Sequence, residues 1–297
     1  MKAWILSDLH LEPSVETLDE SAIPEADVCI CAGNVSSAGM AAGLRLLGRS
    51  LCARMPVVFV PGTHDYKGRS IPEVKADALA EASRFPDLHL LDERTLILRG
   101  IAFVGATLWS DLCLFGDRRE AIEQARRSRD YIEIKTSGKP DRKRFSPQQA
   151  IRLHERARGF IEDELSRLEG MTTVVVTHHA PSLRSMPERY MNDPLAPTLA
   201  SSLEGLIMER QPDLWVHGGV SGERSYSIGC TTVVANPRGF GRLPYGHSIG
   251  KSSLASELVI DVGGRFSSGP LSCSENESRL DVFATDARSL VREGVPA

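Results

Sequence analysis

The sequence has no apolar run that approaches the roughly 20 residues needed for a helix to cross a membrane. Its first eight residues lead into a short strand pattern and lack the apolar core of a secretory signal. The six cysteines form no Cys-x-x-Cys pair, which is the spacing typical of a zinc knuckle. We therefore expect a cytoplasmic protein without membrane contacts, whose cysteines behave as small apolar residues.

An excess of positive charge is also absent, because the formal net charge is -4 at pH 7. No cluster of basic residues interleaved with aromatic residues occurs, so we expect no nucleic-acid partner. The 297 residues are 41% hydrophobic, which is enough apolar material for one large core. We predict a single domain over residues 1–265 and, from its richness in Ser, Glu and Arg, a loosely ordered tail over residues 266–297.

Short apolar runs rich in Val and Ile recur along the chain and predict buried strands. The runs cover residues 3–6, 28–32, 57–60, 101–104, 173–176, 214–216, 232–235 and 258–260. Helical patterns lie between several of them, over residues 40–50, 72–83 and from residue 146 to about residue 169. This alternation predicts a layered α/β fold whose functional side chains follow the carboxyl ends of the strands.

The third helical pattern has a clear start. Ser146 is a capping residue, Pro147 occupies the first helical position, and Gln149 stands where a capping box has its third residue. Apolar residues at helical spacing follow up to Gly170. We predict a long amphipathic helix that begins immediately after Ser146.

Polar motifs follow five of the predicted strands. In chain order they are Asp8-Leu-His10, Gly33-Asn34, Gly62-Thr63-His64-Asp65, Thr177-His178-His179 and Gly218-Gly219-Val220-Ser221. Only one residue separates Asp8 from His10, so the two side chains can offer an oxygen and a nitrogen to one ion. The repetition of polar clusters at successive strand ends predicts that they form one site.

This series resembles the motif order of the calcineurin-like metallophosphoesterases, namely DxH, GD, GNH with an acidic residue, a later His, and GHxH. The resemblance covers residues 1–262 and implies a layered β-sandwich flanked by helices. It also implies two divalent ions, of manganese, iron or zinc, and attack of a metal-bound hydroxide on a phosphate ester. By the same resemblance, Asp8 and His10 bind the first ion, His178 binds the second, and His64 is the catalytic residue that assists the leaving group.

Four positions depart from the family pattern. Asn34 stands where the family has the aspartate that bridges both ions, and Thr63 stands where it has an asparagine ligand. Gly219 and Ser221 replace the two histidines of GHxH. A shared anion offsets the repulsion between two dications, and the neutral Asn34 removes that anion, leaving at most a weak ligand. We therefore predict a broken dimetal site, weak or partial metal binding, and hydrolysis that is lost or very weak.

A one-metal phosphoesterase is an alternative interpretation. It would use Asp8, His10 and His64, with His217 recruited because residues 217 and 219 share one face of an extended segment. The simpler interpretation of His217 is a supporting residue behind the ligands, and the same holds for His179.

A noncatalytic binding module is the other alternative. In this interpretation the cleft binds a small phosphate ester or a protein partner through His64, His178 and Arg238. Binding of such a ligand without turnover would distinguish this module from either hydrolase.

Overall fold

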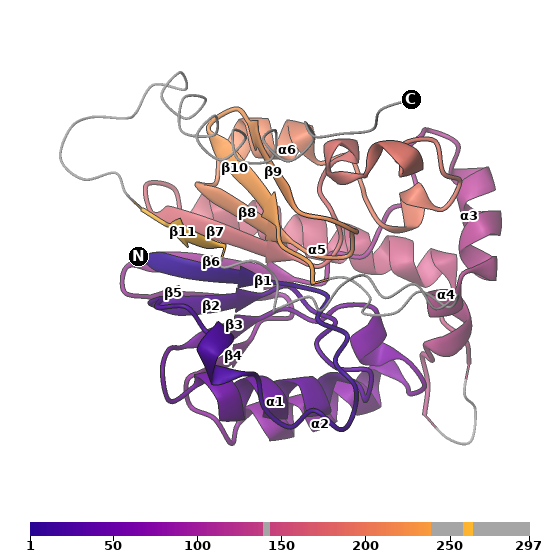
Figure 1. Ribbon diagram of the computed structural model, residues 1–297. Coiled ribbons are helices and arrows are strands. Elements are labelled where there is room, and N and C mark those ends of the chain that lie inside the picture. The colour runs from indigo at the N-terminus through magenta and orange to yellow at the C-terminus, as the bar shows by residue number, and fades with distance from the viewer. Residues whose placement is uncertain (139–142, 239–257, 264–297) are drawn as a thin grey trace, which may run out of the picture.

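The computed structural model describes residues 1–138, 143–238 and 258–263, and the tail predicted for residues 266–297 lies outside this range. Two mixed sheets pack face to face, and helices cover the outer face of each (Figure 1). The first sheet has the strand order β11-β1-β2-β3-β4. Its strands are β1 (Lys2–Leu6), β2 (Val28–Cys31), β3 (Val57–Phe59), β4 (Leu88–Leu90) and β11 (Val259–Asp261). All neighbours in it are parallel except β11, which pairs antiparallel with β1.

The second sheet has the strand order β5-β6-β7-β8-β10-β9. Its strands are β5 (Arg94–Leu98), β6 (Ile101–Ala106), β7 (Thr172–Thr177), β8 (Leu214–His217), β9 (Arg224–Ile228) and β10 (Thr231–Ala235). The four central strands are parallel, whereas β5 and β9 are antiparallel edges. Parallel central strands end at one edge of a sheet, which places the loops that follow them together.

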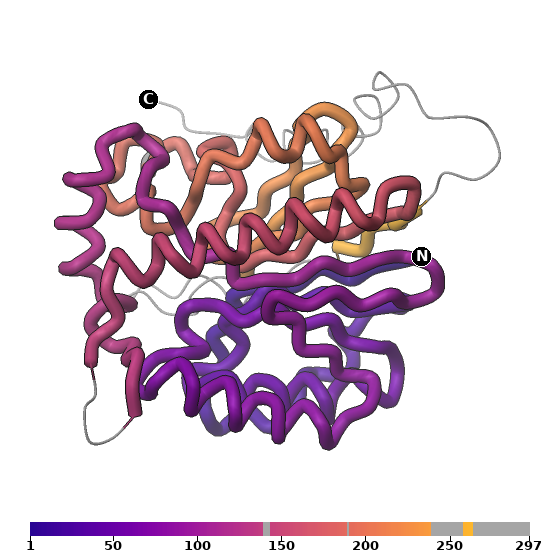
Figure 2. The backbone as a smooth tube through the Cα atoms, turned by 180° about the vertical axis from the view of Figure 1, so that it is seen from behind, coloured from indigo at the N-terminus to yellow at the C-terminus, as the bar shows by residue number. Residues whose placement is uncertain are grey.

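Helices form the outer layers. Helices α1 (Met40–Leu51) and α2 (Ile71–Ala82) cover the first sheet, and α5 (Pro147–Arg167) and α6 (Glu204–Arg210) cover the second (Figure 2). Helices α3 (Arg118–Arg127) and α4 (Arg129–Glu133) lie at the end of the sandwich toward which β1 points in Figure 1. Short 3-10 helices span Glu20–Ala22, His64–Tyr66, Leu183–Ser185, Glu188–Tyr190 and Ala196–Thr198.

Apolar side chains fill three interfaces between these four layers. Ile5, Val58 and Val176 belong to the cluster between the two sheets. A second cluster, which includes Trp4 and Leu47, joins the first sheet to α1 and α2, and a third joins the second sheet to α5 and α6. The central strands are therefore buried on both faces, which explains their continuous runs of Val and Ile.

The structure confirms the strands and helices that the sequence predicts within the described residues. Helix α5 begins at Pro147, where Ser146 accepts a hydrogen bond from the Gln149 amide and Gln149 accepts one from the Ser146 amide at 2.9 Å. Sequence reasoning missed β4, β5 and β9. Strand β9 is a partly exposed edge that reads Arg-Ser-Tyr-Ser-Ile, so it lacks the continuous apolar run of the central strands.

Of the helices that the structure describes, none combines the length and the apolar composition that a membrane crossing requires. Cys29 and Cys31 are fully buried in β2, as expected for cysteines that serve as small apolar residues. Burial raises the pKa of both thiols, so they remain protonated.

Candidate functional site

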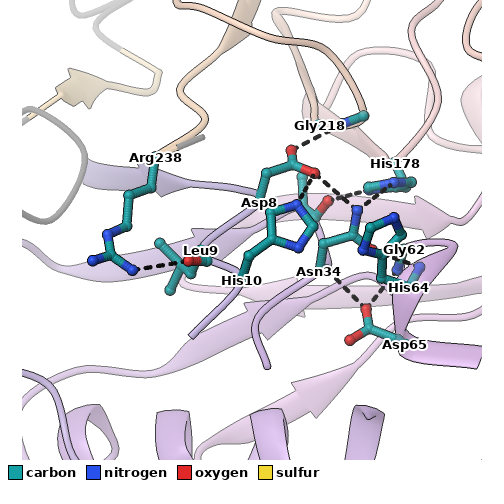
Figure 3. Close-up of polar contacts among 12 residues, drawn as sticks. Asp8, Leu9, His10, Asn34, Gly62, His64, Asp65, His178, Gly218 and Arg238 are labelled. Carbon is teal, nitrogen blue, oxygen red and sulfur yellow. Dashed lines mark hydrogen bonds and ion pairs between the residues drawn. The ribbon is translucent and has the colours of Figure 1, made fainter. Parts of the chain in front are cut away.

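The five polar motifs meet at one end of the sandwich. They follow the carboxyl ends of β1, β2 and β3 in the first sheet and of β7 and β8 in the second. Figure 3 shows side chains of Asp8, His10, Asn34, His64 and His178 gathered around one point. The predicted clustering of these residues at the strand ends is therefore what the fold produces.

Left-handed backbone conformations turn three of these side chains toward that point. Asp8, His10 and Asn34 have φ angles of 51°, 44° and 60°. Residues other than glycine adopt this region infrequently, and those that do include many Asn, Asp and His residues and cluster at functional sites. The backbone of the β1 and β2 loops is thus fixed in a conformation that serves the site.

Asp8 is the central carboxylate, and its side chain is almost completely buried. Its Oδ1 accepts a hydrogen bond from Nδ2 of Asn34 at 2.9 Å, and its Oδ2 accepts one from the Gly219 amide at 3.0 Å. Nε2 of His10 lies 3.7 Å from Oδ1. Burial lowers the pKa of His10 although the Asp8 carboxylate opposes this shift.

Asn34 is held in one orientation by its neighbours. Its Oδ1 accepts a hydrogen bond from the His64 backbone N–H at 2.9 Å, and its own backbone N–H donates to Oδ2 of Asp65 at 2.8 Å. Its Nδ2 lies 3.2 Å from Nε2 of His178 (Figure 3). The side-chain oxygen of Asn34 therefore accepts from a backbone N–H group, and the NH2 group faces both Asp8 and His178.

His178 is oriented by a backbone carbonyl. Its Nδ1 lies 2.7 Å from the oxygen of Ala32, which can only accept, so Nδ1 carries a proton and Nε2 is placed to accept from Nδ2 of Asn34. The neighbouring His179 donates in the same way from Nδ1 to the Thr107 carbonyl at 3.1 Å. Burial lowers the pKa of His179 to about 3, so this ring is neutral at physiological pH.

His64 lies against His10, with the ring centroids 4.7 Å apart. Its Nε2 is 3.8 Å from Oδ1 of Asp130, and Nζ of Lys67 is 2.9 Å from the same oxygen. Burial, followed by the Lys67 ammonium, lowers the pKa of His64 to about 4. Burial raises the pKa of Asp130, but Lys67 together with His64 outweighs this effect and the net shift is downward. The Thr63 side chain makes a smaller contribution in the same direction to the pKa of Asp130.

Asp130 was missed by sequence reasoning. It lies in the five-residue helix α4, far along the chain from every strand-end motif. No motif or spacing marks it, because only the packing of α4 against the His64 segment brings it to the site.

His217 is completely buried at the end of β8. Its Nδ1 donates to the Gly218 carbonyl at 2.9 Å, so its Nε2 is the acceptor for the Ser185 hydroxyl at 2.9 Å. The Ser185 hydroxyl is in turn 2.6 Å from the Tyr226 hydroxyl. Burial lowers the pKa of His217 to about 4. Sequence reasoning missed Ser185 and Tyr226, which no motif contains.

The remaining candidates lie at the margin of the site. Arg238 donates from Nη1 to the Leu9 carbonyl at 3.0 Å (Figure 3), which places its guanidinium beside the β1 loop. Ser221 is exposed. Gly219 has a φ of +67°, a conformation that residues with a side chain adopt at a cost.

The sequence matches the calcineurin-like phosphoesterases over residues 1–220. The chain belongs to that family. A comparison with curated proteins finds no match. Among solved structures, phosphopantetheinyl hydrolase from Mycobacterium tuberculosis is similar with a TM-score of 0.62 and 17% identity, over 91% of this chain and 98% of that chain. The anchor in the inner membrane complex of Plasmodium has a TM-score of 0.45 and 12% identity, over 85% of this chain and 78% of that chain.

Membership of the calcineurin-like phosphoesterases implies divalent metal ions, so the donor atoms of this site can be tested against that requirement. A cation needs oxygen or nitrogen lone pairs, but the NH2 group of Asn34 faces Asp8 and His178 with hydrogen atoms. Gly219 contributes no side chain, and Thr63 offers only a neutral hydroxyl. Within the described residues, no three His, Cys, Asp or Glu side chains are grouped so as to hold a metal ion. This arrangement does not fit the metal pair of the family.

Proposed function

We propose that this chain is a calcineurin-like phosphoesterase scaffold that does not hydrolyse phosphate esters through the family's metal pair, so that hydrolysis is absent or severely impaired. The observation that supports the proposal is the orientation of Asn34, whose NH2 group donates to Asp8 where the family places a bridging carboxylate. An amide in this orientation neither bridges two cations nor offsets their repulsion. Activation of a water molecule and stabilisation of phosphoryl charge by two ions are then lost together.

The test is to measure bound metal and turnover on the same preparation. The protein would be purified from culture supplemented with manganese and analysed for metal, and then assayed with aryl phosphomonoesters and phosphodiesters. We expect substoichiometric metal and no turnover. Two tightly bound ions per chain together with metal-dependent hydrolysis would refute the proposal.

A one-metal hydrolase is the second candidate function. It is favoured by the contact of His10 with Asp8 at 3.7 Å and by the packing of His64 on His10 at 4.7 Å, which keep three family residues together. His217 is not available as a metal ligand in this arrangement, since both of its ring nitrogens are engaged in hydrogen bonds. Metal-dependent turnover that disappears in Asp8→Ala would support this function, and activity that is indifferent to chelators would exclude it.

A noncatalytic module that binds a phosphate-bearing ligand is the third candidate function, and we place it in the cytoplasm. Its support is the position of Arg238, whose Nη1 donates to the Leu9 carbonyl in the loop that follows β1 and carries Asp8 and His10. A thermal-shift panel of phosphate, nucleotides and phosphopantetheine would test it. Phosphopantetheine is included because the similar hydrolase from Mycobacterium tuberculosis is named for that group. Stabilisation without turnover is the expected result, and no shift with any ligand would argue against binding.

A further inference from the structure

The buried carboxylate of Asp8 needs compensating groups around it. The side chain is buried at the junction of both sheets, and a buried carboxylate is strongly destabilising unless cations or hydrogen-bond donors compensate it. In the calcineurin-like phosphoesterases the compensating groups are metal ions. In this chain both carboxylate oxygens are occupied by donors of the protein itself, from Asn34 and from Gly219.

The first donor is the NH2 group of Asn34, which has two hydrogen atoms and two neighbouring acceptors. One acceptor is Oδ1 of Asp8 at 2.9 Å, and the other is Nε2 of His178 at 3.2 Å. Rotating the amide by 180° would point the NH2 group at the His64 amide, so that two donors would face each other. The site therefore fixes Asn34 as a donor toward two residues that bind cations in the family.

The second donor is the peptide unit between Gly218 and Gly219. Its N–H donates to Oδ2 of Asp8 at 3.0 Å, while its carbonyl accepts from Nδ1 of His217 at 2.9 Å. His217 is itself held by the hydroxyl of Ser185, which lies 2.6 Å from that of Tyr226. A peptide that accepts at its oxygen donates more strongly from its nitrogen, because hydrogen bonds in a chain polarise one another.

We infer that Asn34 and the Gly218–Gly219 peptide replace the metal pair as neutral hydrogen-bond donors, so that this chain folds and keeps the geometry of its cleft without metal. The network also assigns a structural role to His217, Ser185 and Tyr226, none of which forms a hydrogen bond with Asp8 itself. The inference rests on the proposed function only in that the site binds no metal pair.

The test compares melting temperatures in excess EDTA and in excess MnCl2 for the full chain and two variants. Asn34→Asp removes the NH2 donor and places a second carboxylate beside Asp8. Asn192→Asp makes the same chemical change at an exposed position and is the matched control. Bound manganese is measured by elemental analysis on each protein.

We expect the unmodified chain and Asn192→Asp to melt at the same temperature in EDTA and in MnCl2. Asn34→Asp should melt roughly 5 to 10 °C lower in EDTA, and MnCl2 should recover much of the difference with manganese bound. The inference is overturned if MnCl2 raises the melting temperature of the unmodified chain, or if Asn34→Asp is as stable as that chain in EDTA.

A second measurement uses only the unmodified chain, so its outcome does not depend on whether the Asn34→Asp variant folds. The side-chain NH2 protons of Asn34 should exchange slowly with solvent in nuclear magnetic resonance spectra, and their resonances should not change when EDTA or MnCl2 is added. Rapid exchange would overturn the inference. If the unmodified chain hydrolyses phosphate esters while its melting temperature is the same in EDTA and in MnCl2, only the proposed function is overturned.

Discussion

A β-carbon added at Gly219 would lie 2.9 Å from the carbonyl oxygen of His178, closer than real β-carbons approach a backbone oxygen. The φ of +67° at Gly219 adds strain for any residue with a side chain. The histidine that the family has at this position therefore cannot be introduced into the observed turn without moving the backbone.

We predict that Gly219→Ala lowers the free energy of unfolding by about 2 to 4 kcal/mol, as the sum of backbone strain and overpacking. Gly68→Ala is the matched control, because Gly68 has a φ of +76° but no atom within 4 Å of its added β-carbon. That variant should lose only about 1 to 2 kcal/mol. Equal losses in urea denaturation of both variants would contradict the close contact at Gly219.

Asp65 supports the site by accepting two backbone hydrogen bonds on one oxygen. Its Oδ2 accepts from the amides of Asn34 and Gly62, each at 2.8 Å, while Oδ1 has no partner. Asp65→Asn can keep the acceptor in place with its NH2 group at the unpartnered position, so we expect its unfolding free energy to stay within about 1 kcal/mol of the parent. Asp65→Ala leaves two buried donors unsatisfied and should lose about 2 to 5 kcal/mol.

Burial raises the pKa of Asp65 to about 6, so the difference in unfolding free energy between Asp65→Asn and the parent should depend on pH. The folded state holds the proton more tightly than the unfolded state, so the contribution of Asp65 to stability falls as pH rises through about 6. Asp65→Asn should therefore compare most favourably with the parent above that pH. Chemical denaturation of both proteins across that range measures the difference, and a constant difference would contradict the shift.

His154 is buried in α5 and its Nδ1 has no hydrogen-bond partner. Burial lowers the pKa of His154 below 6.5. Between the folded-state pKa and pH 6.5, the unfolded state therefore binds a proton more readily than the folded state. Stability contributed by the neutral ring is complete above pH 6.5 and is lost as pH falls toward the folded-state pKa. Each unit of pKa difference corresponds to about 1.4 kcal/mol. We predict a flatter dependence of unfolding free energy on pH for His154→Gln than for the parent, and parallel profiles would contradict this assignment.

Ser146 caps α5 through its hydroxyl, which accepts from the Gln149 amide. Ser146→Ala should lower the unfolding free energy by about 1 kcal/mol, because one amide in the first turn loses its partner. Ser166→Ala makes the same change at an exposed position in the last turn of the helix, where alanine is the better helix former, and should be neutral or slightly stabilising. Thermal denaturation of the two variants separates capping from helix propensity.

The fold could be predicted from the sequence to a large extent because local patterns agree with it. Continuous apolar runs identify the strands that are buried on both faces, and Ser146 with Pro147 marks the start of α5. Of the edge strands, β9 carries no such run, and β5 has only the short run Leu96-Ile97-Leu98, none of whose residues is fully buried. Their membership of the second sheet follows from pairing with distant segments, which a local pattern does not record.

The sequence by itself determined the family and the four departures from its motifs, because donor atoms are a property of residue identity. Only the tertiary structure decided how Asn34 is turned, since that orientation depends on the His64 amide and on Asp8, which reach it from other loops. It also brought Asp130 to His64 and Tyr226 to the network behind His217. Hydrogen bonds of this kind depend on distances between segments far apart in the chain, and those distances exist only once both sheets have packed.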